Sequence, residues 1–307
     1  MSAARPGISW VAICVTLALV AGACAPTATA HPSSSASGSA GAVAAGSSVT
    51  SPSAAGSPAA RATGQSPSGS AAAGTVQVAA AADLQFAMQD LIAAFRARTG
   101  IRVTATYGSS GNFYSQITNG APFDVLFSAD IGYPERLEQA GLAPAGSTRL
   151  YAIGRIVVWV PNASSIDIGR PGMQALLDPA VHTIAIANPE HAPYGSAAVA
   201  AMQHYGIYDR LAAKLVYGEN ISQTAQFVQS GAADVGILAL SLALAPTLRN
   251  AGRYWLVPND AYPAIEQGVV VLKRARDPAA AQAFVDFVLG PSGRTVLDRF
   301  GFGPPGS

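Results

Sequence analysis

The sequence predicts an α/β protein of two lobes, with parallel-type sheets, helices on both faces of each sheet, and two crossover strands that form a hinge. From Thr75 onward, short apolar runs alternate with segments whose apolar residues recur at helical spacing, as in largely parallel sheets with right-handed crossovers. Two further apolar runs, Arg155–Pro161 and Gly268–Leu272, are predicted as strands that leave the first lobe and return to it. Two crossings are typical of a cleft that closes on a ligand.

The expected lobe boundaries follow from these crossings. The first lobe is expected to contain residues 75–156 and 265–307, and the second residues 157–264. The first lobe should contain strands at 75–81, 101–107 and 124–128, and helices at 84–98, near 113–117, and at 133–140, 279–289 and 292–300. The second should contain strands at 183–187, 215–217 and 233–238, and helices at 196–205, from 219 through 228, and to 244.

The N-terminal residues 1–23 are predicted to be an export signal. Arg5 supplies a positive charge, and Ile8–Val20 is an apolar run too short for a comfortable membrane span. The following segment, Val20–Cys24, resembles a bacterial lipobox, which implies cleavage before Cys24 and attachment of lipid to it. Such an anchor would hold the protein on the outer face of the cytoplasmic membrane. The alternative is ordinary signal-peptidase cleavage with an incidental cysteine.

Residues 24–74 are predicted to be a disordered linker behind the lipidated cysteine. They are almost wholly Ala, Ser, Gly, Pro and Thr, with Arg61 as their only charged residue. Such a segment cannot bury enough apolar surface to offset its chain entropy. As a flexible coil it would reach roughly 40 Å, which suits a tether to a membrane partner. A mucin-like stalk is the alternative.

Composition excludes some functions. Only 11% of the 307 residues are charged and the formal net charge is +1, so we expect no nucleic-acid partner. His182, His191 and His204 are too scattered for a metal site, and a structural hydrogen bond is expected for His191. Asp124 and Asp130 are expected to act in caps and turns.

Four small-residue turns at predicted helix starts are the candidate site. They are Ala82-Asp83, Ser109-Ser110-Gly111, Pro193-Tyr194-Gly195 and Asn220-Ile221-Ser222. Each helix start leaves N–H groups without intrahelical partners and carries about half a positive charge. Because two of the turns fall in each lobe, we expect them to converge on one small oxyanion, which needs no Arg or Lys. A helix cap is the alternative for any one of them.

The same stretches resemble the molybdate/tungstate-binding proteins of ABC transporters, within the type 2 periplasmic-binding-protein fold. The matching segments follow the family order: Ala79–Asp90, Gly108–Gly111, Asn119–Asp124, Phe127–Asp130, Asn188–Gly195, Gly231–Gly236, Gly290-Pro291 and Arg299–Phe302. The resemblance implies oxyanion contacts at Asp83, Ser110, Tyr194 and Ile221, with Ala82 and Ser109 as further candidates. It also implies a molybdate or tungstate ligand, no cofactor and an ABC permease as partner. We expect a monomeric receptor.

Two positions depart from the family pattern. Asp83 stands where the family often has Ser or Asn, and a carboxylate about 4 Å from a unit negative charge costs roughly 4 kcal/mol at an effective dielectric near 20. Asp83 should therefore turn away to cap its own helix while its backbone N–H serves the ligand, or else a proton is held in the site. We favour the cap. Ala239 falls where some members place a ligand-contacting Tyr, and Tyr194 is expected to fill part of that wall.

Three other functions remain open. The same fold could bind another small anion, such as sulfate or a carboxylate. A secreted hydrolase could use Ser110, but its Gly-Ser-Ser-Gly setting is not a nucleophile elbow and no base is placed beside it, so no catalytic residue is assigned. A cell-surface adhesion module on a stalk would lack a small-ligand cleft.

Overall fold

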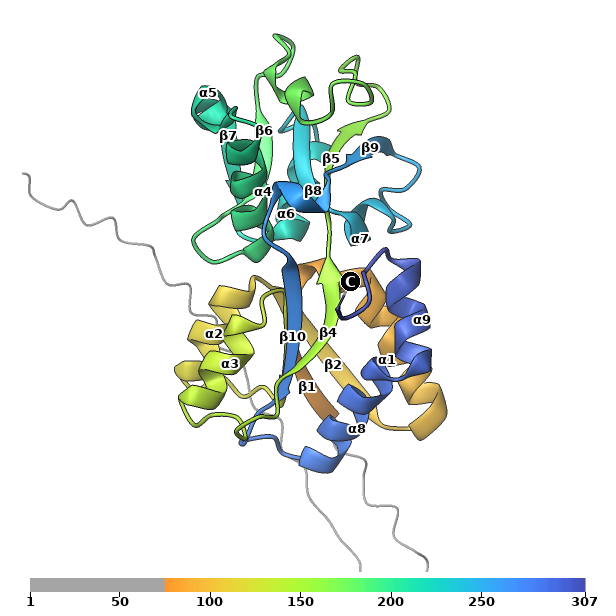
Figure 1. The fold of residues 1–307 in the computed structure, drawn as a ribbon. Helices are drawn as coiled ribbons and strands as arrows, with labels where there is room; N and C mark the ends of the chain where they lie inside the picture. The colour runs from red at the N-terminus through yellow and green to blue at the C-terminus, as the bar shows by residue number, and fades with distance from the viewer. Residues whose placement is uncertain (1–74, 307) are drawn as a thin grey trace, which may run out of the picture. The chain divides into compact units, whose positions relative to one another are not determined.

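The computed structural model describes residues 75–306, which all belong to one compact unit of the chain. The predicted export signal, Cys24 and the linker lie outside the described residues. Each of the two lobes has a five-stranded mixed sheet, in the orders β2-β1-β3-β10-β4 and β7-β6-β8-β5-β9 (Figure 1). The first sheet contains β1 (Thr75–Ala81), β2 (Arg102–Gly108), β3 (Val125–Ser128), β4 (Arg149–Gly154) and β10 (Ile265–Val271). The second contains β5 (Ile156–Pro161), β6 (Ile184–Ala187), β7 (Leu215–Gly218), β8 (Val235–Ala239) and β9 (Gly252–Leu256).

One strand in each sheet runs against the other four. In the first sheet β10 is antiparallel to both β3 and β4, and in the second β5 is antiparallel to both β8 and β9. Both strands enter their sheet from the other lobe, whereas β1, β3, β6 and β8 end on the side where the lobes meet. Because β5 and β10 enter at the side where the lobes meet, they must run away from it, opposite to their neighbours. The two sheets are therefore mixed, whereas the sequence predicted parallel-type sheets.

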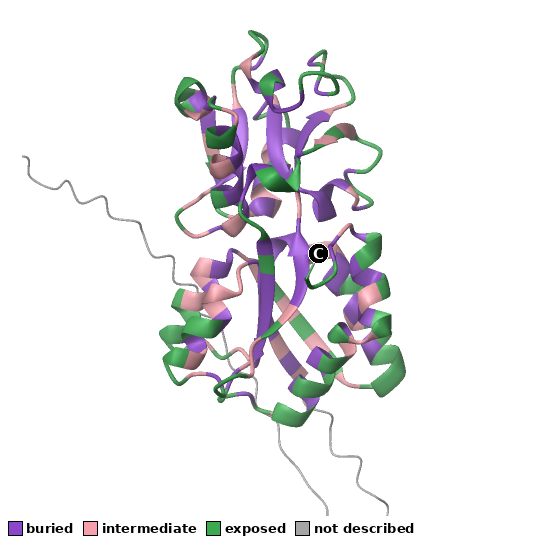
Figure 2. Ribbon diagram, in the orientation of Figure 1, coloured by how far each residue is buried: buried purple, intermediate pink, exposed green. Residues whose placement is uncertain are grey.

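Helices cover both faces of the first sheet, as predicted. Figure 1 shows α2 and α3 on one face and α1, α8 and α9 on the other. The helices of this lobe are α1 (Gln85–Thr99), α2 (Ser110–Thr118), α3 (Gly132–Gln139), α8 (Pro278–Leu289) and α9 (Pro291–Arg299). Val78 packs in the core under α1 and α8, and its neighbour Ala79 packs under α2. Successive residues of a strand point to opposite faces, so the buried part of β1, Val78–Ala81, is apolar on both faces, while Thr75 and Gln77 at its start are only partly buried (Figure 2).

The second lobe has one continuous core around Trp159 and Ile186, which are both buried. Its helices are α4 (Pro193–His204), α5 (Tyr208–Leu211), α6 (Ile221–Gln229) and α7 (Leu240–Ala243), with 3₁₀ turns η2 (Gly172–Leu177), η3 (Ala212–Lys214) and η4 (Asn259–Ala261). The first lobe has one 3₁₀ turn, η1 (Ala82–Leu84), between β1 and α1. Among the described residues, no helix is long and apolar enough to cross a bilayer.

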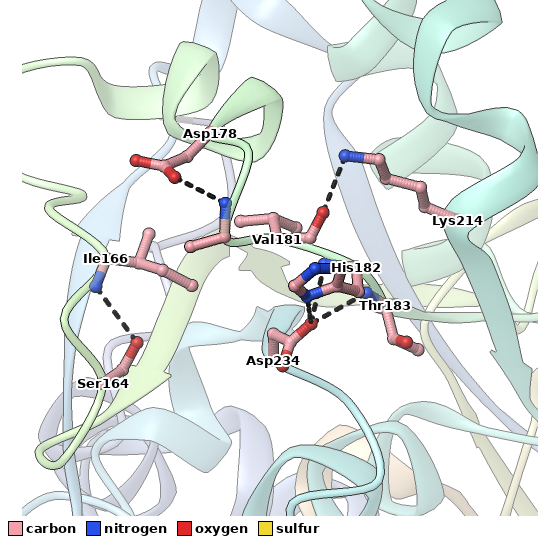
Figure 3. Close-up of polar contacts among 9 residues, drawn as sticks. Ser164, Ile166, Asp178, Val181, His182, Thr183, Lys214 and Asp234 are labelled. Atoms are coloured by element: carbon pink, nitrogen blue, oxygen red, sulfur yellow. Dashed lines mark hydrogen bonds and ion pairs between the residues drawn. The ribbon is translucent and has the colours of Figure 1, made fainter.

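A polar cluster fixes the loop that leads into β6 (Figure 3). The Asp234 carboxylate accepts hydrogen bonds from the backbone N–H groups of His182 and Thr183, at 2.8 and 2.9 Å. Lys214 Nζ donates to the Val181 carbonyl at 2.6 Å. These contacts occupy His182 and Asp234 in holding the loop. Within residues 75–306, no three His, Cys, Asp or Glu side chains are grouped so that they could hold a metal ion.

Candidate oxyanion site

The four predicted turns meet at one small pocket between the lobes. Its empty space is about 200 Å³, and its walls come from the ends of β1, β2 and β3 and the starts of α2, α4 and α6. It is lined by Ala81–Asp83, Gly108–Ser110, Ala129, Ala192–Tyr194, Asn220 and Ile221. No lining residue is a Lys, Arg or His. The structure thus brings Asp83, Ser110, Tyr194 and Ile221 together, with Ala82 and Ser109 beside them; their contact with an oxyanion stays a prediction.

The starts of three helices place backbone N–H groups at this pocket. Ser110 and Ile221 are the first residues of α2 and α6, and Tyr194 is the second residue of α4, so their N–H groups have no intrahelical acceptor. The Asn220 side chain accepts from the backbone N–H groups of Ser222 and Gln223, at 3.0 and 3.1 Å. The N–H of Ile221 is therefore the first-turn donor that this cap does not engage.

The Ser110 hydroxyl is arranged as a donor. Its Oγ accepts a hydrogen bond from the Ala129 backbone N–H at 2.9 Å, and the side chain is fully buried. That bond uses an oxygen lone pair and leaves the hydroxyl hydrogen for a ligand. His191 bonds Ser109 instead, with Nδ1 2.9 Å from Oγ, and its Nε2 lies 3.6 Å from Glu219 Oε1. The structural hydrogen bond expected for His191 is confirmed.

The expectation that Asp83 caps its own helix is wrong. The turn η1 intervenes, so Ala81 is the N-cap of η1 and Leu84 that of α1, and neither cap has a side-chain hydrogen bond. The Asp83 carboxylate instead accepts hydrogen bonds from two side chains elsewhere in the fold. Its Oδ2 lies 2.9 Å from the hydroxyl of Tyr194, in α4 of the second lobe, and 2.5 Å from Nε2 of Gln267, in β10. These two hydrogen bonds take the place of a helix cap because both donors reach the carboxylate in its buried position.

Burial governs the charge of Asp83, which is 1% exposed. Desolvation raises its pKa from 3.8 to about 6, and hydrogen bonds from Gln267, Tyr194 and the local backbone oppose this rise only in part. Among the described residues, Oδ1 of this carboxylate is buried and has no hydrogen-bond partner. The same burial, with the Asp83 charge, raises the pKa of the Tyr194 hydroxyl well above its usual value.

Sequence reasoning missed the residues that hold Asp83. Gln267 is fully buried in β10; its amide oxygen accepts from the Tyr151 hydroxyl at 2.6 Å, and its Nε2 also lies 3.0 Å from the Tyr194 hydroxyl. Ser241 donates to the Asp83 carbonyl at 2.7 Å, and Ser222 donates to the Ala82 carbonyl at 3.0 Å. The available signal was Gln267 itself, a lone amide that leads into an apolar strand. Ser222 stood in one of the predicted turns, but nothing in the sequence marked it or Ser241 as a partner of this segment.

The lobes also meet beside the pocket. The Gly111 N–H donates to the His191 carbonyl at 3.0 Å, and Asn112 Nδ2 donates to Glu219 Oε1 at 2.5 Å. With the bonds of Tyr194, Ser222 and Ser241, these contacts describe a closed cleft. Ala239 is buried at the end of β8 and does not line the pocket, whereas Tyr194 does.

A wider groove of about 750 Å³ adjoins the pocket and shares Ala129, Ala192 and Pro193 with it. The Asp130 and Glu266 carboxylates stand on its wall, and its lining residues include no Lys or Arg. Those two charges disfavour an anion in the groove. The smaller pocket also has one carboxylate in its wall, Asp83, but the starts of three helices converge on it, and it is therefore the candidate oxyanion site.

Comparison with known proteins agrees with this geometry. Residues 76–303 match the family model described as bacterial extracellular solute-binding protein. The chain is 40% identical over 228 residues to the molybdate-binding protein ModA of Azotobacter vinelandii, which covers 74% of this chain and 89% of the relative. It is 39% identical to ModA of Rhodobacter capsulatus over 227 residues, covering 74% and 87%.

A solved structure, the periplasmic molybdate-binding protein of Azotobacter vinelandii, superposes with a TM-score of 0.71 at 34% identity and covers 75% of this chain and 99% of that one. The sulfate-binding protein SubI of Mycobacterium tuberculosis, with a TM-score of 0.61 at 17% identity over 76% of this chain and 87% of that one, shares the fold. The predicted resemblance is confirmed: the chain belongs to the bacterial extracellular solute-binding proteins and, within them, to the molybdate-binding protein (ModA) family.

Proposed function

We propose that this protein is an extracytoplasmic receptor that closes its two lobes on molybdate, or on tungstate, and delivers it to an ABC permease. One observation carries the proposal: helix starts from both lobes converge on one small pocket whose lining has no cationic side chain. Such a site binds a dianion through N–H groups and helix dipoles. The lobes, residues 75–156 with 265–307 and residues 157–264, would open and close about the two crossings.

The protein binds its ligand and is not proposed to be an enzyme. Among the described residues, the Ser110 hydroxyl oxygen accepts a hydrogen bond from the Ala129 backbone N–H, and His191 is bonded to Ser109. No base is therefore placed to activate Ser110 as a nucleophile. This arrangement argues against the hydrolase.

Isothermal titration with molybdate, tungstate, sulfate and phosphate tests the receptor. We expect one molybdate or tungstate per chain, bound at least about 100-fold more tightly than sulfate, a margin of about 3 kcal/mol. The matched control is Ser115→Val, an exposed position on α2 outside the pocket, which should bind like the parent. Tighter binding of sulfate than of molybdate or tungstate would mean that the receptor serves another small anion. No binding of any of the four would contradict the oxyanion site.

We further propose that Cys24 carries lipid that anchors a monomeric receptor to the outer face of the cytoplasmic membrane. The support is sequence alone: the export signal, the lipobox resemblance at Val20–Cys24 and the Ser/Ala/Gly-rich tether. In an expressing bacterium, mass spectrometry should find a lipidated N-terminal Cys24, and Cys24→Ser should release the protein from the membrane fraction. An unmodified Cys24, or a Cys24→Ser protein that stays in the membrane, would contradict the anchor.

A further inference from the structure

We propose, building on the proposed function, that the receptor takes up one proton from solvent with each oxyanion, held on Asp83 between its unpartnered Oδ1 and the bound anion. Oδ2 of Asp83 accepts from two side chains, the Tyr194 hydroxyl and the Gln267 amide, and the backbone N–H groups of Asp83 and Leu84 lie near the carboxylate. Oδ1 is buried without a partner among the described residues, and Asp83 lines the pocket. A proton on Oδ1 would turn this idle acceptor into one more donor for the anion.

No positive charge offsets the carboxylate. The titratable groups that face Asp83 are the hydroxyls of Tyr194 from α4 and Tyr151 from β4, and burial with the Asp83 charge keeps both neutral by raising their pKa. The remaining contacts, from Gln267 and Ser241, are neutral. The Arg155 charge acts on Tyr262, and none of the ion pairs among the described residues includes Asp83.

The magnitudes favour protonation. At an effective dielectric near 20, a unit negative charge about 4 Å away disfavours the ionised carboxylate by roughly a thousandfold. Because the pKa of Asp83 in the closed cleft is about 6 without the anion, placing a proton on it at pH 7 costs only about tenfold. The gain exceeds the cost, so the anion and the proton bind together.

The sign of the pH dependence follows. Below pH 6 Asp83 is already protonated in the free protein, so affinity is flat. Above pH 6 a proton must be taken up on binding, so affinity falls by about tenfold per pH unit until the carboxyl group of the complex itself titrates. Two further titratable side chains lie close to the pocket, His191 at Ser109 and Glu219 beside His191, and a variant of Asp83 separates their contributions from that of Asp83.

The test is titration calorimetry of molybdate from pH 5.5 to 8.5 in buffers of different ionisation enthalpy, which counts protons. Wild type should take up nearly one proton per molybdate at pH 7.5. Asp83→Asn keeps an acceptor for Tyr194 and Gln267 and places a fixed NH₂ donor where the proton would sit. It should take up no proton, and it should bind more tightly than wild type at pH 8.

The matched control is Asp124→Asn, a buried carboxylate of the same lobe that bonds Gln77 and Arg276 and does not line the pocket. It should keep the proton uptake of wild type. Wild-type binding without proton uptake would overturn the proton proposal and leave the receptor standing. Equal uptake in Asp83→Asn would also overturn it, by assigning the proton elsewhere. Absence of molybdate binding at every pH would overturn the proposed function.

Discussion

Replacing Gly111 by valine is expected to weaken molybdate binding by at least about 100-fold, or about 3 kcal/mol. A Cβ on Gly111 would lie 2.8 Å from the His191 carbonyl oxygen and 2.9 Å from His191 Cβ, both on the opposite lobe, and 2.7 Å from the Tyr133 hydroxyl. The Tyr133 hydroxyl can move, but the His191 backbone can yield only by displacement of the second lobe. The α2 start would then be held away from the ligand.

The same change should leave the free protein almost as stable as wild type, because an open cleft removes the clash. Thermal unfolding without ligand, beside calorimetry with molybdate, separates the two effects. Ser115→Val, which places the same side chain on the exposed face of α2, should change neither. Affinity of Gly111→Val within threefold of wild type would show that closure against His191 is not needed for binding.

Replacing Asp83 by asparagine is expected to raise the free energy of unfolding of the ligand-free protein by about 2.5 kcal/mol more at pH 8 than at pH 4. Desolvation raises the folded-state pKa of Asp83 from 3.8 to about 6. The unfolded chain therefore releases its proton first as the pH rises, and the folded state loses stability through the window from about 3.8 to 6. Above pH 6 the cost is constant, and asparagine does not bear it.

Asp124→Asn provides the opposite sign. Burial raises the pKa of Asp124, but hydrogen bonds from Gln77 and Arg276, with the Arg276 charge, outweigh it and lower that pKa below 3.8. Its carboxylate stabilises the fold above about pH 3.8 and loses that effect only as the pH falls below 3.8, so Asp124→Asn should destabilise the protein by nearly the same amount at pH 4 and at pH 8. Urea unfolding of both variants at pH 4 and 8 measures this. If the free energy of unfolding of the two variants depended on pH in the same way, the raised pKa of the buried Asp83 carboxyl group would be refuted.

Local sequence predicted most of the fold because the signals were local. The strand at Thr75–Ala81 matches β1, and the glycine that ends the first helix, Gly100, adopts a positive φ of 74° as the last turn closes. The prediction missed β9, a short, partly exposed edge strand, and β4, which precedes the crossing. It also missed the antiparallel direction of β5 and β10, which depends on the lobe from which each strand enters.

The site residues likewise divide into those with a local sequence signal and those without one. Helix starts are visible in sequence, so the turns at Ser110, Tyr194 and Ile221 could be found one at a time. The partners of Asp83 could not, because Gln267 lies 184 residues away and Ser241 158 residues away. Because the sequence did not reveal these distant donors, a helix cap was the simplest role to predict for Asp83, a carboxylate at a helix start. The fold instead supplies two donors from β10 and α4.

Crystals grown with molybdate and measured at the molybdenum absorption edge would locate the bound anion. We expect a single anomalous peak in the pocket, with oxyanion oxygens within about 3.2 Å of the backbone nitrogens of Ser110, Tyr194 and Ile221. We also expect one oxygen at that distance from Asp83 Oδ1. A peak in the wider groove beside Asp130 and Glu266, or no peak in the pocket at saturating molybdate, would contradict the oxyanion site.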